Sequence, residues 1–159
     1  MLPVYADYLK ELESLYTDAS KAIDDLPQEA LDWIAKPGMN SITVLVAHMT
    51  GAQRFLVGDL VGGIPSNRNR QAEFETKGLA PADVTAMLGR AMFVTRDTLE
   101  RLTVADLEST QPHSKDGRSF TAAFALYHAL AHAGVHVGHI QMTRQLWEQK
   151  MTSDLKAAS

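Results

Sequence analysis

Apolar residues recur at three- and four-residue steps along four separate stretches of the chain, and this repeat constrains the fold more than any other feature. The stretches run from about residue 3 to 24, 40 to 61, 81 to 102 and 119 to 149, with polar residues on their other sides. Each helix of this kind must bury its apolar face against the others. The sequence therefore predicts an all-α four-helix bundle that forms a single domain over residues 1–159.

The ends of these stretches carry ordinary helix signals. Asn40 or Ser41 can cap the second helix, because its side-chain oxygen can accept a free backbone N–H group. Gly62 and Gly63 end that helix, and Pro81 opens the third. The connectors are about 14 to 19 residues long, so a helix can restart at the end of the bundle where the previous one began. At least one such crossover is possible.

The composition excludes several classes of function. The chain has no cysteine, so it can form neither a disulfide nor a thiolate metal site and has no cysteine nucleophile. Its formal net charge of −4 argues against nucleic-acid binding, and Arg68 and Arg70 in the polar connector are expected to be solvated. No stretch has the roughly 20 apolar residues of a membrane span, and the N-terminus lacks a signal peptide's apolar region. We expect a cytoplasmic protein that binds no membrane.

Four of the six histidines lie within twelve positions of the last stretch. At about 100° per residue, His128, His132, His136 and His139 fall within an arc of about 80° beside apolar residues, so we expect all four rings to face the bundle interior. Each buried polar group left without a partner costs about 1 to 3 kcal/mol. A divalent metal would remove this cost, because it binds neutral imidazole nitrogens directly.

Two of these histidines have the spacing of a metal-binding pair. His132 and His136 place their rings on adjacent turns of one helix. A third ligand must come from another helix, and His48 is the only other histidine on an apolar helical stripe, since His113 lies in a connector. We predict a site made by His48, His132 and His136, with an open coordination position as in catalytic centres. His128 and His139 are candidates for proton transfer or for purely structural roles.

The segment HAGVHVGHIQMTRQLW resembles the final-helix signature of the DinB-like (YfiT-like) metal-dependent bundle family, in which two histidines four apart precede a glycine and usually a glutamine. The segment GMNSITVLVAHMTGAQRFLVGDL resembles the second helix of that family. The resemblance places His48, His132 and His136 on the three metal positions and Gly138 on the glycine. His139 stands where the family often has glutamine.

The resemblance also implies an architecture and a chemistry. It implies an up-down-down-up bundle with long connectors, a homodimer, and a divalent ion that is zinc or nickel in the first place, with iron, manganese or copper as alternatives. The implied reaction uses a low-molecular-weight thiol in the transfer to, or isomerisation of, a small electrophilic substrate. Two alternatives stay open at this point: a hydrolase that uses metal-bound hydroxide, and a non-enzymatic metal-binding or stress-response bundle.

Overall fold

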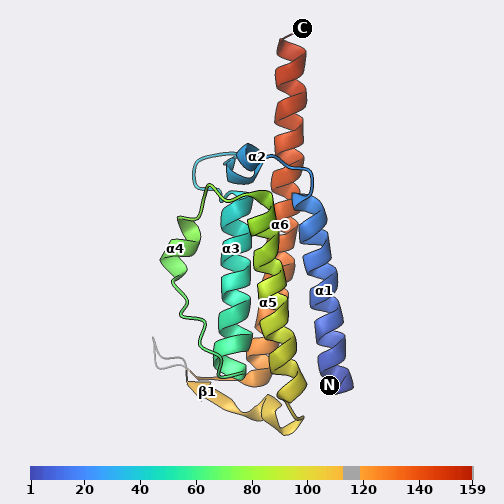
Figure 1. Ribbon diagram of the computed structural model, residues 1–159, viewed down its shortest axis with the longest axis vertical. Coiled ribbons are helices and arrows are strands. Elements are labelled where there is room, and N and C mark those ends of the chain that lie inside the picture. The colour runs from blue at the N-terminus through green and yellow to red at the C-terminus, as the bar shows by residue number, and fades with distance from the viewer. Residues whose placement is uncertain (113–118, 159) are drawn as a thin grey trace.

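The computed structural model describes residues 1–112 and 119–158. Its regular elements in these ranges are mostly helical, and four of the helices are long (Figure 1). In chain order the elements are α1 (Pro3–Ile23), α2 (Gln28–Asp32), α3 (Ile42–Gln53), the π-helix η1 (Arg54–Val61), α4 (Arg70–Phe74), α5 (Pro81–Arg101), the 3-10 helix η2 (Ala105–Glu108), β1 (Thr110–Pro112), β2 (Ser119–Thr121) and α6 (Ala122–Ala157).

The long helices form a bundle in which α1 and α6 run in one direction and α3 and α5 in the other (Figure 1). Helix α6 packs between α1 and α3, and α5 packs between the same two helices on the other side. Helices α3 and α5 are parallel because the connector of residues 62–80, which contains α4, returns the chain along the outside of α3. The predicted four-helix bundle with up-down-down-up order is confirmed.

Small and branched side chains fill the centre of the bundle. Along α6 the buried positions include Ala125, Ala129, Ala133, Val137 and Ile140. Their low volume lets α6 approach its neighbours closely, and the larger core side chains come from the other helices, among them Leu12, Ile23, Ile42, Met49 and Leu99. No helix among the described residues is long and apolar enough to cross a bilayer.

The helix boundaries refine the sequence-based prediction at three places. Ser41, not Asn40, caps α3, with its Oγ accepting from Val44 N at 3.3 Å. The last helix begins at Ala122 rather than near residue 119, because residues 119–121 pair antiparallel with 110–112. It also continues to Ala157, beyond residue 149, so that its last turns project past the bundle (Figure 1).

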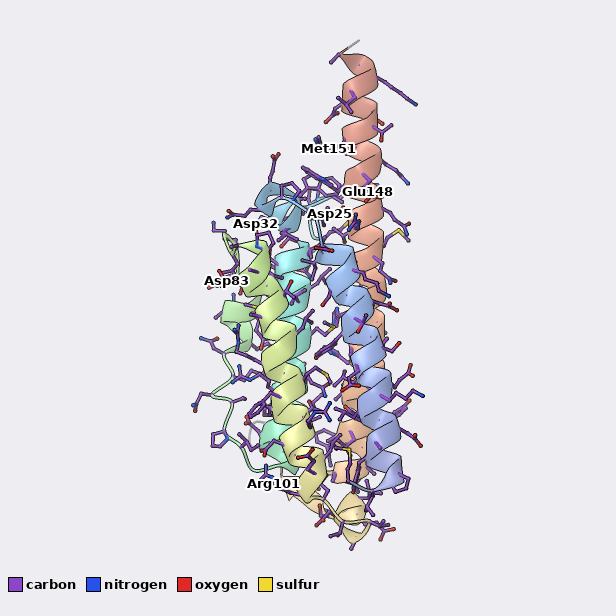
Figure 2. The ribbon with its side chains drawn as sticks, turned by 45° about the vertical axis from the view of Figure 1, so that its right-hand side comes forward. Asp25, Asp32, Asp83, Arg101, Glu148 and Met151 are labelled. Atoms are coloured by element: carbon purple, nitrogen blue, oxygen red, sulfur yellow. The ribbon has the colours of Figure 1, made fainter. Side chains whose placement is uncertain are left out.

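One arginine ties the end of α1 to α6. Arg144 donates to the backbone oxygens of Lys21 and Asp24 at 3.1 and 2.9 Å. It also pairs with the carboxylates of Asp25 and Glu148, which lie near this junction in Figure 2. Because Arg144 satisfies carbonyl groups at the end of α1, it stabilises the join between the two parallel helices.

We expect Arg144→Ala to lower the free energy of unfolding by about 1 to 2 kcal/mol, since hydrogen bonds to a charged group are lost at a half-buried position. Urea denaturation measures the change. Arg101→Ala is the matched control, because the bonds that Arg101 forms with described residues stay within its own helix, to Asp97, and its side chain is half exposed. Its expected effect is within about 0.5 kcal/mol. Equal losses in the two variants would contradict the assignment.

Candidate metal centre

His48, His132 and His136 come together between α3 and α6. His48 follows the Ser41 cap by two turns of α3, and the two other rings lie on successive turns of the neighbouring, antiparallel α6. The Nε2 atom of His132 lies 3.2 Å from Nε2 of His48 and 3.1 Å from Nε2 of His136. Three ring nitrogens from two helices therefore converge on one point.

This arrangement suits a cation better than hydrogen bonds. A single proton on Nε2 of His132 can be donated to only one of its two short nitrogen contacts, which leaves the other short contact without a hydrogen bond of its own. Zinc–nitrogen bonds of about 2.0 to 2.1 Å in a tetrahedral site would separate the nitrogens by about 3.3 Å. The observed separations are close to this value, so the residues fit a divalent ion.

A buried carboxylate orients His48. Nδ1 of His48 lies 3.0 Å from Oε2 of Glu73, and since a carboxylate only accepts, the ring carries its proton on Nδ1 and presents the Nε2 lone pair to the cluster. Arg68 in turn donates to both oxygens of Glu73, from Nε at 2.6 Å and from Nη2 at 2.8 Å. Burial acts to raise the pKa of Glu73, but the hydrogen bonds from Arg68 and His48 outweigh it, and the pKa is lowered.

Gly51 makes room for this carboxylate. It lies one turn after His48 on α3, and a Cβ atom at this position would overlap Oε1 of Glu73. Sequence reasoning missed both Gly51 and Glu73. The expectation that Arg68 is solvated is wrong. Its guanidinium is largely buried against Glu73 because the connector folds back onto α3. The one local signal is Asn69, whose side chain caps α4 and so fixes the turn that delivers Glu73.

The two rings on α6 are neutral at pH 7. Burial, followed by electrostatic repulsion from His136, His48, His128 and Arg68, lowers the pKa of His132 to about 4. Burial, followed by His48 and His139, lowers the pKa of His136 to about 4 as well. Neutral imidazoles keep the lone pairs that a metal requires.

These pKa values predict that the protein, once a chelator has removed any metal, is destabilised by acid. Because the folded state binds these protons only near pH 4 and an unfolded histidine binds them near 6.5, the unfolded chain holds more protons within that interval. We therefore expect the contribution of His132 and His136 to the free energy of unfolding to be fully present above about pH 6.5 and to decrease as the pH drops towards 4. Urea denaturation at several pH values measures the slope, and His136→Asn should flatten it. An unchanged slope would contradict the shift.

The expectation that all four histidines of α6 face the interior is wrong for His128 and His139, which are exposed. The buried stripe of α6 is centred on its alanines and on Ile140, roughly 100° around the helix from His128. The histidine arc therefore lies on the flank of the stripe. His132 and His136, nearer its centre, are half-buried, whereas the outer pair meets solvent.

A cavity of about 340 Å³ opens beside the histidine cluster. Its lining comes from α3, η1, the connector, β2 and α6, and consists of His48, Ala52, Phe55, Leu56, Arg68, Arg70, Phe120, Phe124, His128 and His132. His128 thus borders the space next to the cluster. His139 is not part of this lining, although its ring lies 5.6 Å from that of His136. The described residues of the lining include no aspartate and no glutamate.

Comparison with known proteins places this architecture in a family. A family model described as a protein of unknown function, DUF1572, matches residues 4–155. The chain belongs to the DUF1572 family. The family description carries no reaction, and no curated protein sequence matches this DUF1572 chain.

Two solved structures share the fold of the DUF1572 protein. A conserved protein from Enterococcus faecalis superposes with a TM-score of 0.72 at 14% identity, over 92% of this chain and 98% of that one. YfiT from Bacillus subtilis, described as a probable metal-dependent hydrolase with an unusual four-helix bundle topology, gives 0.70 at 17% identity, over 91% and 89%. At these identities the likeness establishes the fold, and at that level the resemblance to YfiT-like bundles is confirmed.

Proposed function

We propose that this DUF1572 protein is a divalent-metal enzyme that activates a low-molecular-weight thiol for transfer to, or isomerisation of, a small electrophilic substrate. The observation that carries the proposal is the convergence of three imidazoles at the edge of an open cavity. His48, His132 and His136 would hold the ion, with zinc or nickel favoured and iron, manganese or copper as alternatives. A bound divalent ion lowers the pKa of a thiol that reaches it and so supplies the nucleophile that the chain lacks.

The residues around the cluster have defined tasks in this proposal. Glu73 keeps the proton of His48 on Nδ1, and Arg68 keeps Glu73 ionised and in place. His128 borders the cavity and is the candidate that accepts or returns a proton there. His139, outside that lining, is assigned no step.

Hydrolysis is the second candidate, favoured by the description of YfiT as a probable metal-dependent hydrolase. The lining of the cavity favours the thiol instead, because the described residues there include no carboxylate that could serve as a general base for water. A purely structural metal site is the third possibility, and the cavity beside the histidines argues against it, since structural sites are closed.

A panel of substrates separates these functions. Zinc- or nickel-loaded protein is mixed with electrophiles in the presence and absence of small thiols, and separately with esters and amides. We expect turnover only when a thiol is added, and none from His136→Ala. Turnover of esters or amides without thiol would establish the hydrolase instead. Stoichiometric metal binding without turnover of any of these substrates would favour the non-enzymatic metal-binding bundle.

Two further expectations accompany the proposal. The homodimer implied by the family resemblance is supported by exposed apolar side chains on α6, namely Tyr127, Val135 and Met142, which a second copy could cover. Light scattering after gel filtration tests it.

The cytoplasmic location expected from the cysteine-free composition stays a prediction.

A further inference from the structure

The wall of the cavity beside the histidine cluster is a row of stacked rings. Phe120 and Phe124 stack with centroids 5.0 Å apart and planes 12° from parallel. Phe124 and His128 stack at 5.5 Å and 7°. The row continues to His132, whose centroid lies 6.1 Å from that of His128. An offset row of aromatic rings therefore leads from the start of α6 to the cluster, and its last ring, His132, is tilted by 39° from His128.

The rest of the cavity lining is partly apolar, and its charged residues are positive. Phe55 and Leu56 of η1 contribute apolar side chains to the lining. The charged residues among the described lining are Arg68 and Arg70. The charge of Arg68 is balanced by Glu73.

Arg70 supplies the remaining charge. Its guanidinium carbon lies 4.8 Å from the centre of the Phe74 ring, and it forms no ion pair with any residue that the structure describes. A guanidinium held over an aromatic face keeps its N–H donors free for a planar anionic group.

We propose that this cavity binds a small aryl anion, a single flat ring that carries a carboxylate or a similar oxyanion. The ring lies against the Phe124–His128 stack, and the anionic group is bound by Arg70. The assignment of this molecule as the substrate rests on the proposed function, whereas its binding rests only on the rings and on Arg70. A volume of about 340 Å³ lies at the small end of the range of about 300 to 1,000 Å³ typical of ligand pockets, which suits one ring.

Three matched probes test the two parts of the inference by calorimetry. Benzoate has both the ring and the charge, cyclohexanecarboxylate keeps the charge without a flat ring, and benzamide keeps the ring without the charge. We expect saturable benzoate binding with a Kd of roughly 1 mM or below. Cyclohexanecarboxylate should bind about two- to tenfold more weakly, as loss of an aromatic pair implies, and benzamide about tenfold more weakly.

Two substitutions assign these preferences to residues. Arg70→Gln should remove the advantage of benzoate over benzamide, and Phe124→Leu should remove its advantage over cyclohexanecarboxylate. Arg101→Gln and Phe93→Leu are matched controls, since Arg101 pairs with Asp97 and Phe93 is 73% exposed on α5, with neither lining the cavity. Both controls should bind all three probes as the unmodified protein does.

The titrations are run on zinc-loaded protein and on protein whose metal has been removed with a chelator. A failure of the aryl-anion site can then be distinguished from a failure of the proposed metal-dependent function. Benzoate preference in the chelated protein supports the aryl-anion site even if no metal-dependent turnover is found. Benzoate binding that disappears on chelation shows a carboxylate on the metal instead and overturns the inference. Retained preference in Arg70→Gln, or equal binding of the three probes, also overturns it while leaving the metal centre intact.

Discussion

Replacing His48 with alanine is expected to abolish stoichiometric metal binding. The variant loses one of three converging nitrogens, and it is the one whose proton is held by a buried carboxylate. His136→Ala should have the same effect, because two remaining imidazoles make a weak site. Elemental analysis of protein purified without a metal-affinity resin should fall from about one ion per chain to background.

His139→Ala is the matched control for this measurement. It removes an imidazole from the same face of α6, but at an exposed position outside the cluster of three. Its metal content should stay at the level of the unmodified chain. Circular dichroism checks that the His48 variant is folded, since that side chain is buried. Tight metal retained by both His48→Ala and His136→Ala would exclude the proposed ligand set.

Glu73→Gln is expected to weaken metal binding by about 10- to 100-fold, as is typical when a group that orients a ligand is lost. The amide keeps the size of the side chain but removes the charge that balances Arg68 and holds the Nδ1 proton of His48. Competition with a chromogenic zinc chelator measures the affinity. An affinity within about twofold of the original would show that Glu73 does not orient the ligand.

Gly51→Ala tests the same contact without changing any charge. The added methyl group would overlap Oε1 of Glu73, so it must displace the carboxylate from His48 and lower the metal affinity in the same direction. Gly89→Ala is the control, because open space surrounds that position on α5. It should leave the metal affinity unchanged and stabilise the helix by up to about 1 kcal/mol.

The features that depend on local spacing could be predicted from the sequence. The apolar stripes of the long helices determined the bundle, and the four-residue spacing of His132 and His136 determined that their rings lie on adjacent turns. His48 could be paired with them because it is the one histidine on another apolar stripe. That these three bind a metal stays a prediction.

The features that depend on tertiary packing could not be predicted. The contact of Glu73 with His48 requires a connector to fold back onto α3, and the Asn69 cap marks only the turn before Glu73, not the return of the connector onto α3. The exposure of His128 and His139 follows from the alanines that form the contact face of α6, because small apolar side chains mark a buried face less distinctly than large ones. The pairing of residues 110–112 with 119–121 is likewise too short to leave an alternating pattern.

The connector of residues 62–80 couples the topology of the bundle to the charges beside the histidine cluster. It exists because two consecutive long helices, α3 and α5, run the same way, and the chain must travel back along the bundle between them (Figure 1). The same return path carries Arg68, Arg70 and Glu73 to the rim of the histidine cluster. Substitutions in this one surface segment can thus change the charges beside the imidazoles while α3 and α6, which carry the imidazoles, stay as they are.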